Sequence, residues 1–459
     1  MIISSAFAGK RYAVLGLARS GAAAVETLLA SGAEVTAWDL QDVARARFEG
    51  RCVLKDPLEM DLAGFDGLVV SPGVPLNTHP ITAHAKAHEV RLIGDIELFA
   101  QARADLLPHK VVGVTGTNGK STTVALVHHI LQMANVPSVL GGNIGEPILA
   151  QEPLAPNEHG VGVYVLELSS YQIDITHNLD CEAAALTNIT PDHLDRYDGF
   201  AGYAASKARL PGMQSTRNLA VFGTLDGPCG DIFQAEDARR EAGRAVVADL
   251  ARFAPLQSGW PTLQGPHNLQ NVAVAVALVE ELGVTEAQWR HALPRFCNLP
   301  HRMEFVGEDH GVIFINDSKA TNPASTAPAL AAYPPRGSGP RVHWIVGGLA
   351  KEDGLGETEA ELGNVAVAYT VGEAGPRFAE LLEAKGLRVE RCELVSEAVR
   401  RAQDAAKPGE IVLLSPACAS FDQFRDYEKR GEHFRQLVGV MADCSVAPDP
   451  DGALKDFVA

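Results

Sequence analysis

Apolar positions in the first hundred residues form short runs that alternate with stretches of helical pattern. Residues 11–16 and 34–39 each predict a strand, residues 22–30 between them predict a helix, and 68–73 predict a later strand that ends in a turn. This alternation is typical of a parallel sheet with helices on both faces. We therefore predict a first α/β domain over residues 1–108, with its boundary at Pro108.

The same alternation occurs twice more along the chain. Strands are predicted at 110–115, 162–168 and 183–188, with helices from 121 and over 267–282, and the last third adds strands at 312–315, 343–346, 366–371 and 410–414. A Pro/Gly-rich connection is expected at 333–340. The charged, Ala- and Arg-rich segment 231–260 fits either a helical excursion or a loop. We therefore predict three tandem α/β domains over residues 1–108, 109–304 and 305–459.

Length and charge narrow the classes of function. The chain of 459 residues is too long for one core, and its net charge of −18 argues against non-specific binding to nucleic acid or to an anionic membrane. Seven cysteines without a CxxC pair indicate reduced thiols in a cytosolic protein. Residues 1–10 lack a basic region and a cleavage site, and no apolar run reaches the roughly 18 residues of a membrane span. We expect a cytoplasmic monomer without a membrane span.

A glycine-rich loop, GVTGTNGKS at 113–121, follows an apolar strand and opens a helix. Its glycines let backbone N–H groups converge on an anion, Lys120 supplies positive charge, and Ser121 can reach a Mg²⁺ ion. The strict GxxxxGK[ST] pattern has glycine at position 114, where this chain has Val114. The alternative is a glycine-rich turn without a ligand. The loop predicts bound nucleotide phosphates and a central domain like the P-loop ATPases.

Two further polar residues follow buried strands of the central domain. Glu167 ends the strand at 162–168, and His193 comes shortly after the strand at 183–188. Ligands of open α/β sheets bind beyond the carboxyl ends of the strands, so both residues suit a Mg²⁺ site, although this ion prefers oxygen ligands. Each residue could equally be part of a salt-bridged structure.

The first domain carries an approximate dinucleotide fingerprint. GLARSG at 16–21 follows one strand and Asp39 ends the next, with Ala18 in place of the middle glycine. The first domain is therefore predicted to be Rossmann-like, as is the third. A nicotinamide-dependent oxidoreductase remains an alternative function.

Several longer motifs resemble a known family. TGTNGKST at 115–122, ELSSYQ at 167–172 and DHLDR at 192–196 resemble the Mur ligases of peptidoglycan synthesis. Four further segments are similar to the branch that adds D-glutamate to UDP-N-acetylmuramoyl-L-alanine: GPHNLQN at 265–271, LPHRME at 299–304, INDSKATN at 315–322 and SPACASFDQF at 415–424. The resemblance implies an ATP-dependent amide ligase that works through an acyl phosphate. A sister ligase such as folylpolyglutamate synthase is the nearer alternative, although the SPACAS segment argues against it.

The resemblance also implies roles for the residues of the central machinery. The implied ATP contacts are Gly116, Thr117, Asn118, Gly119, Lys120, Ser121, Thr122, Asn268, Asn271, Arg302 and Asp317. The implied Mg²⁺ ligands, for two ions, are Ser121, Glu167, His193 and a carbamylated Lys207. Lys120, His193 and Lys207 would be catalytic, and His301 would orient the reacting groups. The alternatives are a plain surface lysine at Lys207 and a surface ion pair at Arg302.

The two remaining substrates are assigned in the same way. The implied contacts of the UDP-substrate are Gly16, Leu17, Ala18, Arg19, Ser20, Asp39, Gly73, Asn143, Ser169 and Gln172. Relatives often have a Thr-Arg pair after the aspartate, where this chain has Leu40 and Gln41, so the uracil contacts are not assigned. The implied D-glutamate contacts are Lys319, Thr321, Lys351, Ser420, Phe421 and Tyr427. Lysines and hydroxyls suit a dicarboxylate because both donate hydrogen bonds to it.

Overall fold

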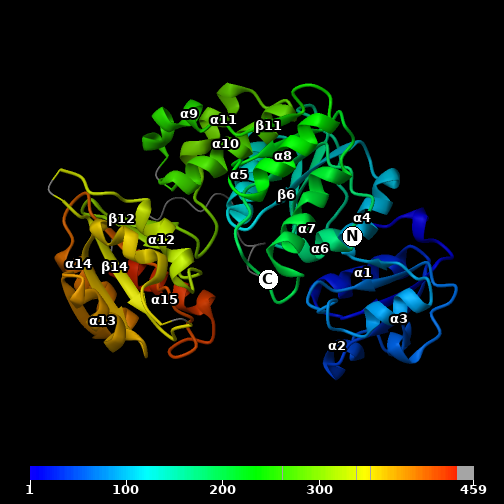
Figure 1. Ribbon diagram of the computed structural model, residues 1–459, viewed down its shortest axis with the longest axis horizontal. Helices are drawn as coiled ribbons and strands as arrows, with labels where there is room; N and C mark the ends of the chain where they lie inside the picture. The colour runs from blue at the N-terminus through cyan, green and yellow to red at the C-terminus, as the bar shows by residue number, and fades with distance from the viewer. Residues whose placement is uncertain (261, 338, 352, 442–459) are drawn as a thin grey trace. The chain divides into compact units, whose positions relative to one another are not determined.

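The computed structural model describes residues 1–260, 262–337, 339–351 and 353–441. Within them it contains three β-sheets, each flanked by helices (Figure 1). This confirms the predicted α/β fold class, with three sheets in succession along the chain. The chain divides into two compact units, one of Met1–Asp249 with Gln270–Ala292 and one of Leu250–Leu269 with the chain from Leu293. The proposed boundaries at 108 and 304 stay a prediction, and residues 442–459 of the predicted third domain lie outside the described residues.

The first sheet has five parallel strands in the order β3-β2-β1-β4-β5. Its strands are β1 (Arg11–Leu15), β2 (Glu34–Trp38), β3 (Val53–Leu54), β4 (Gly67–Val70) and β5 (Leu92–Ile93), and its helices are α1 (Arg19–Ala30), α2 (Asp42–Ala46), α3 (Ile81–Ala87) and α4 (Asp95–Ala102). The strand β1 is central because residues 12–15 form a continuous apolar run, which a strand covered on both faces requires. The two-residue strands β3 and β5 are too short to produce a periodic pattern.

The second sheet has six parallel strands in the order β11-β10-β9-β6-β8-β7. Its strands are β6 (His109–Thr115), β7 (Ser138–Gly142), β8 (Gly162–Glu167), β9 (Ala183–Leu186), β10 (Leu219–Phe222) and β11 (Ala245–Val247). The helices along this part of the chain are α5 (Lys120–Met133), α6 (Ser170–Asp174), α7 (Gly199–Met213), α8 (Pro228–Arg239), α9 (Leu250–Phe253), α10 (Pro266–Glu281) and α11 (Glu286–Ala292). For residues 231–260 the sequence suggested either a helix or a loop, and neither alternative included the strand β11. That strand has only three residues at the sheet edge, and Val247 is exposed, so the sequence shows no buried run there.

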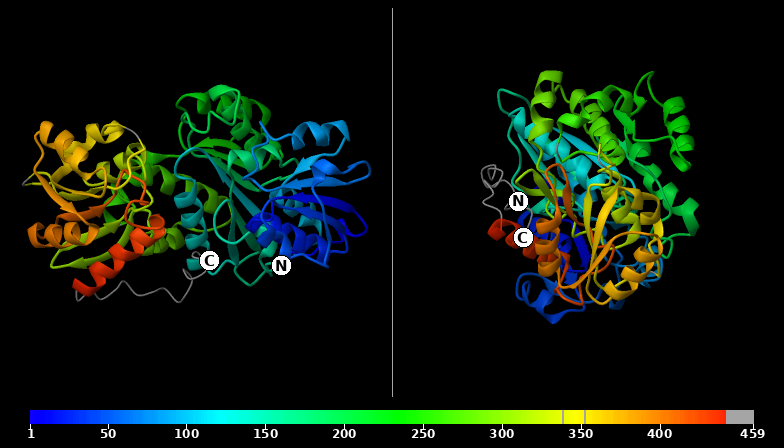
Figure 2. Two further views of the ribbon diagram at one scale, coloured as in Figure 1. Left: turned by 90° about the horizontal axis from the view of Figure 1, so that it is seen from below. Right: turned by 90° about the vertical axis from the view of Figure 1, so that its left-hand side faces the viewer.

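The third sheet also has six strands, in the order β12-β13-β17-β14-β15-β16. Its strands are β12 (Glu304–Asp309), β13 (Val312–Asn316), β14 (Val342–Gly347), β15 (Val365–Val371), β16 (Val389–Glu393) and β17 (Ile411–Leu414), and its helices are α12 (Pro323–Ala331), α13 (Gly375–Ala384), α14 (Val395–Ala405) and α15 (Tyr427–Met441). Only β12 runs antiparallel, as an edge strand paired with β13. The helix α15, red in Figures 1 and 2, lies beside this sheet. In the connection expected at 333–340, residue 338 lies outside the described residues.

The first two sheets share one apolar core. Phe99 of α4 packs against Tyr164 of β8 with ring centroids 5.0 Å apart, and Phe7, Leu28 and Leu149 belong to the same buried cluster. Shared burial of this kind is the main stabilising contribution to a domain contact. It explains why the first two sheets form one compact unit.

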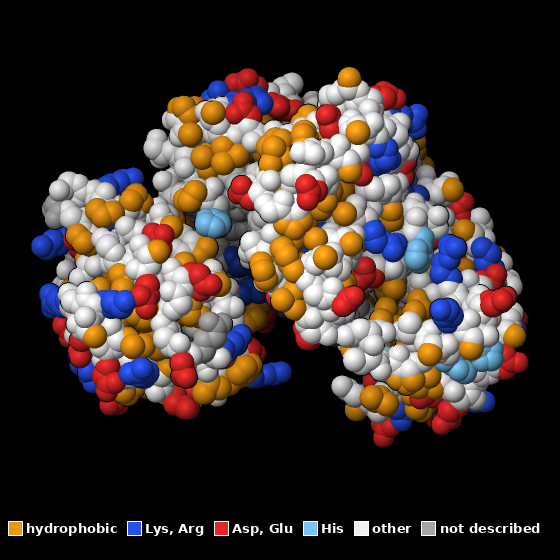
Figure 3. All heavy atoms as spheres, viewed as in Figure 1, with side chains coloured by type: hydrophobic (Ala, Val, Ile, Leu, Met, Phe, Trp, Pro, Cys, Tyr) orange, Lys and Arg blue, Asp and Glu red, His pale blue; other side chains and the backbone are white. Residues whose placement is uncertain are grey.

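The surface and the cysteines agree with the composition. On the face shown in Figure 3, basic and acidic side chains are interspersed. Six cysteines are free thiols, and Cys444 lies outside the described residues. Among the helices that the structure describes, none combines the length and apolarity needed to cross a bilayer. The absence of nucleic-acid partners stays a prediction.

Candidate active site

The glycine-rich loop connects β6 to α5, as its sequence predicts. Gly116 and Gly119 have φ values of 146° and 84°, in a region that glycine tolerates and residues with a side chain rarely adopt. A Cβ atom at Gly116 would clash with the Thr187 hydroxyl, and one at Gly119 would clash with the Asn271 amide. Val114 lies inside β6, buried and paired with Glu167 of β8. Position 114 therefore belongs to the strand, where no glycine is required.

The segment after β9 holds the loop in place. The Thr117 N–H donates to the Asn188 carbonyl at 2.8 Å, and the Asn118 N–H donates to Asn188 Oδ1 at 2.9 Å. The Thr187 hydroxyl donates to the Asn118 carbonyl at 2.7 Å. The loop is thus fixed at the N-terminus of the 14-residue helix α5. Unpaired N–H groups and the helix dipole make such a position favourable for an anion.

Two lysine amines meet at one carbonyl of this loop. Lys120 Nζ donates to the carbonyls of Gly116 and Thr117 at 2.9 and 2.8 Å, and Lys207 Nζ donates to Gly116 at 2.7 Å. Lys207, on α7, is only 2% exposed. Burial, with a smaller effect from the charge of Lys120, lowers the pKa of Lys207 to about 7. The alternative of a plain surface lysine is therefore wrong.

Glu167 ends β8 as a buried carboxylate. Its Oε1 accepts from Asn143 Nδ2 at 2.9 Å, while its buried Oε2 has no hydrogen-bond partner among the residues that the structure describes. No ion pair to Glu167 occurs in the same set, which removes the salt-bridged alternative there. An unpartnered buried carboxylate oxygen costs stability unless a cation or donor meets it. Position and chemistry together fit a cation ligand.

His193 lies on the loop after β9 in a strained conformation. Its φ of 52° is unusual for a residue other than glycine. The imidazole is about half exposed, with Nε2 3.5 Å from Asp192 Oδ2 and its ring centroid 5.2 Å from that of Tyr171. Both interpretations of His193 therefore stay open: its ring is near enough to Asp192 for an ion pair, and it is exposed enough to bind a ligand.

Tyr203 connects the loop, His193 and Lys207, and sequence reasoning missed it. Its hydroxyl lies 3.2 Å from Thr117 Oγ1, its ring centroid lies 6.3 Å from that of His193, and Lys207 Nζ lies 4.6 Å from the ring. Its position one helical turn before Lys207 is the only sequence signal for this role.

Ser121 is buried in the first turn of α5, and Thr122 follows it there.

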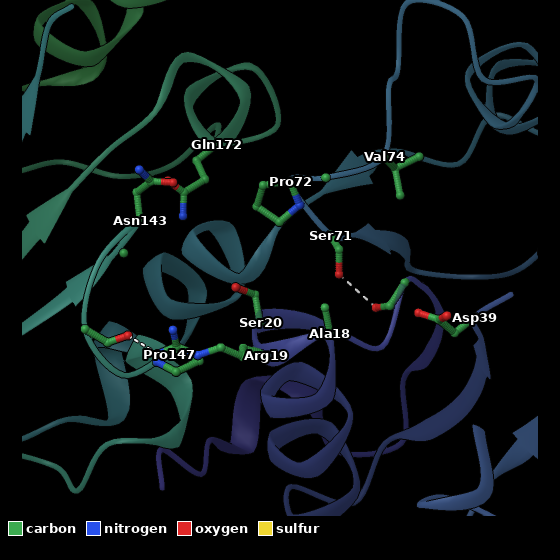
Figure 4. A pocket seen from close by; sticks show the side chains of 14 residues that line it. Ala18, Arg19, Ser20, Asp39, Ser71, Pro72, Val74, Asn143, Pro147 and Gln172 are labelled. Carbon is green, nitrogen blue, oxygen red and sulfur yellow. Dashed lines mark hydrogen bonds between the residues drawn. The ribbon is translucent and has the colours of Figure 1, made fainter. Parts of the chain in front are cut away.

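A cavity of about 420 Å³ lies between the ends of the first two sheets (Figure 4). The predicted UDP-substrate residues that line it are Gly16, Ala18, Arg19, Ser20, Asp39, Gly73, Asn143 and Gln172. Leu17 and Ser169 do not line it. The Leu17 N–H donates to Asp39 Oδ2 at 2.6 Å, and Ser169 caps α6 together with Gln172.

The lining contains residues that sequence reasoning did not assign, among them Ser71, Pro72 and Pro147. The Ser71 hydroxyl donates to the Gly16 carbonyl at 2.8 Å, as the dashed line in Figure 4 shows. Arg19 also donates to the Gly145 carbonyl. Asn143 both lines the cavity and binds Glu167, so it links the cavity to the buried carboxylate.

The two predicted asparagines of α10 have different surroundings. Asn271 Oδ1 accepts from the Thr123 hydroxyl at 3.4 Å and faces Gly119 of the phosphate loop. Asn268 Nδ2 donates to the Gln264 carbonyl at 3.1 Å and belongs to the second compact unit. Asn271 therefore lies at the phosphate loop, in the same compact unit.

Asp317 and its neighbours occupy the carboxyl end of β13. Asp317 Oδ1 accepts from the Met303 N–H at 3.1 Å and Oδ2 accepts from the Ser415 hydroxyl at 2.7 Å. Burial raises the pKa of Asp317 to about 7, and the charge of Arg302 opposes that shift. Nδ1 of His301 lies 3.0 Å from Nδ2 of Asn316. Burial lowers the pKa of His301 to about 4, so its imidazole is neutral at pH 7.

The predicted D-glutamate residues fall into pairs. Lys351 Nζ donates to the Thr321 hydroxyl at 3.0 Å, and Lys319 Nζ lies 5.0 Å from the Tyr427 ring. Ser420 is buried on the loop after β17, whereas the neighbouring Phe421 is 70% exposed. All six residues belong to the second compact unit.

Comparison with known proteins identifies relatives over almost the whole chain. Residues 114–279 match the Mur ligase middle domain, and residues 301–418 match the Mur ligase glutamate ligase domain. The UDP-N-acetylmuramoylalanine–D-glutamate ligase of Novosphingobium aromaticivorans is 61% identical over 453 residues, 98% of this chain and 99% of that protein.

Two solved structures share the fold at low identity. The UDP-N-acetylmuramate–alanine ligase MurC of Thermotoga maritima has a TM-score of 0.54 at 15% identity and covers 94% of this chain and 99% of its own. The MurF ligase of the same organism, solved in complex with ADP, has a TM-score of 0.54 at 17% identity and covers 95% and 96%. With its domain matches and its close relative, the chain belongs to the Mur ligase family, in the branch of the UDP-N-acetylmuramoylalanine–D-glutamate ligases.

Proposed function

We propose that this ATP-dependent ligase joins D-glutamate to UDP-N-acetylmuramoyl-L-alanine in the cytoplasmic part of peptidoglycan synthesis. One observation carries the proposal: Asn143 lines the cavity and donates to Glu167, so a substrate cavity adjoins a buried carboxylate beside the phosphate loop. The relative with 61% identity bears the name of this activity. The ADP in the related MurF structure supports a nucleotide at the loop.

The proposed chemistry solves a problem of leaving groups. A carboxylate oxygen is a poor leaving group, so the γ-phosphoryl group of ATP is first transferred to the L-alanine carboxylate. The amine of D-glutamate then attacks the carbonyl carbon of this acyl phosphate, loses a proton, and displaces phosphate. Lys120 and the N-terminus of α5 would neutralise charge on the phosphates, and the loop geometry that Asn188 holds would align them.

Two side-chain oxygens near the phosphate loop suit Mg²⁺ by their chemistry. The unpartnered Oε2 of Glu167 and the Ser121 hydroxyl are oxygen donors of the kind that Mg²⁺ prefers. His193 and a carbamylated Lys207 would complete the proposed set, for two ions. When bound, the metal would neutralise charge on the phosphate oxygens.

The environment of Lys207 supports carbamylation. With a pKa of about 7, a large fraction of the amine is neutral at pH 7. Its nitrogen lone pair can attack CO₂, which forms an N–C bond and releases one proton, and the side chain becomes an anion. This product would replace repulsion between Lys207 and Lys120 by attraction, and it would give the site an oxygen ligand.

The rate of carbamylation is expected to depend on pH with a midpoint near 7. Protonated Lys207 cannot attack CO₂, so the rate rises as pH increases through the folded pKa of about 7. An exposed lysine would show its midpoint near the ordinary value of about 10.4. The rate of uptake of ¹³C-labelled CO₂ into the protein, followed by the carbamate signal in ¹³C NMR from about pH 5.5 to about pH 11, measures this. A carbamate that forms only above pH 9, or no carbamate, would contradict the assignment.

The other ligand roles are proposals of the same kind. The cavity suits the UDP-substrate, with Gly16, Ala18, Arg19, Ser20, Asp39, Gly73, Asn143 and Gln172 as its lining. Asn271 next to Gly119, and Asp317 beside Arg302, suit ATP. Lys319, Thr321, Lys351, Ser420, Phe421 and Tyr427 suit D-glutamate, with His301 as a neutral orienting group. The domain boundaries at 108 and 304, and the monomeric state, complete the proposal.

A phosphate-release assay separates the three candidate activities. With ATP, Mg²⁺ and UDP-N-acetylmuramoyl-L-alanine, we expect release that depends on D-glutamate and is absent with L-glutamate. Release with L-glutamate and a folate instead would identify a folylpolyglutamate synthase. NADH oxidation without phosphate release would identify the oxidoreductase suggested by the segment at 16–21.

A further inference from the structure

Arg430 is a fully buried cation, on α15, that has no role in the proposal above. The residue is 2% exposed, and among the described residues no carboxylate lies within ion-pair distance of it. Its guanidinium donates instead to the Ser318 hydroxyl at 3.0 Å and to the carbonyls of Ser318, Cys418 and Ala419 at 2.8, 3.1 and 3.2 Å. A buried charge is retained at a cost to stability, so four bonds from one guanidinium indicate a purpose beyond packing.

The four bonds join two loops that follow the carboxyl ends of two neighbouring strands of the third sheet. Ser318 follows β13 and residues 418–419 follow β17, and these two strands are parallel neighbours. The first loop continues to Lys319 and Thr321, and the second continues to Ser420 and Phe421. The guanidinium therefore holds together the two segments proposed for D-glutamate.

The same bonds fix the direction of the backbone N–H groups. In a trans peptide the carbonyl and the next N–H point in opposite directions, and the described part of the chain has no cis peptide. Three carbonyls turned towards Arg430 thus turn three N–H groups away from it. Those of Lys319 and Ala419 donate to the carbonyls of His301 and Leu349 at 3.0 and 2.9 Å.

The third of these N–H groups belongs to Ser420. Neither it nor the Ser420 hydroxyl has a hydrogen-bond partner within the described ranges, and the hydroxyl oxygen is not among the fully buried unpartnered atoms, so it is open to solvent. Donors in this position can pair with water in the free protein and with an acceptor of a ligand when one binds.

We propose that Arg430 is a positioning residue for D-glutamate, because it holds the loops of Ser318 and Ala419 so that the Ser420 donors face a carboxylate of the amino acid. The inference rests on the proposed function, which supplies the dicarboxylate substrate. Arginine suits the task because its planar fork reaches several carbonyls at fixed angles, whereas lysine presents one flexible point charge.

The variant R430K tests the proposal while it keeps the charge. We expect the KM for D-glutamate to rise about tenfold or more, with the KM values for ATP and the UDP-substrate within about twofold of wild type. A second variant, S318A, removes one acceptor of the fork, and we expect a rise of about threefold in the same constant. If R430K does not fold, S318A decides whether this cluster of bonds positions D-glutamate, because the hydroxyl that it removes accepts from Arg430 and donates to the Tyr427 carbonyl at 2.8 Å.

The matched control is R240K in the central domain. Arg240 is also buried and donates to the carbonyls of Asn218 and Pro211, and all three residues belong to the first compact unit. We expect R240K to lower the Tm without a selective change in the KM for D-glutamate. Lowered Tm values for R430K and S318A with an unchanged KM for D-glutamate would assign Arg430 a structural role alone. If the wild-type protein releases no phosphate with D-glutamate, the proposed function itself fails, which is a distinct result.

Discussion

Replacing Lys207 by alanine is expected to lower the rate of D-glutamate-dependent phosphate release about 1,000-fold. The variant loses the amine that meets Lys120 at the Gly116 carbonyl and, with it, the carbamate proposed as an oxygen ligand. Loss of one preorganised charged group at a phosphoryl-transfer site has an effect of this size. Formate or acetate is expected to restore part of the activity, because a small carboxylate can occupy the space left by the truncated side chain.

The control for this prediction is the exposed Lys86 of α3, whose replacement by alanine is expected to leave the rate unchanged. The Tm of the Lys207 variant is measured on the same samples, because truncating this buried side chain leaves a cavity and removes its bond to Gly116, both of which lower stability. Full activity of K207A without added carboxylate would exclude the carbamate. Loss of activity together with loss of folding would be explained by structure alone.

Glu167→Gln is expected to reduce activity about 100-fold at a fixed Mg²⁺ concentration and to shift the Mg²⁺ activation curve to higher concentration. The amide keeps an oxygen for Asn143 Nδ2 but replaces the unpartnered Oε2 by a neutral NH₂ group, which cannot bind a cation. Stability should be equal or higher, because an unpaired buried carboxylate oxygen is removed. Mg²⁺ titrations of phosphate release and thermal unfolding of the same samples measure both effects.

Glu97→Gln is the matched control, because Glu97 is a buried carboxylate whose oxygens are already satisfied. Its Oε2 accepts from the N–H groups of His177 and Asn178 at 2.7 and 3.0 Å. We expect E97Q to lower the Tm, since neutral hydrogen bonds replace charge-assisted ones, and to leave the Mg²⁺ dependence unchanged. The opposite pattern, a lower Tm for E167Q with wild-type Mg²⁺ dependence, would show that Glu167 is a structural carboxylate.

The sequence by itself determined the elements that carry long apolar patterns and the loops between them. Central strands such as β1 and β17 contain continuous apolar runs because both of their faces are buried. The phosphate loop was readable because Gly116 and Gly119 adopt φ values that favour glycine, which leaves a local mark in the sequence. The short edge strand β11 and the antiparallel β12 were not predicted, since their burial depends on neighbours and leaves no long run.

Only the tertiary structure decided what surrounds each polar side chain. A lysine at position 207 has the same letter whether it is exposed or buried, and its lowered pKa arises from the packing of α7 against the phosphate loop. The contacts of Tyr203 and the carbonyls around Arg430 bring together segments that are far apart in the chain. The sequence likewise does not show that one oxygen of Glu167 is buried without a partner. Hydrogen bonding and desolvation act over a few ångströms in space, so these properties follow from the folded chain and not from local sequence.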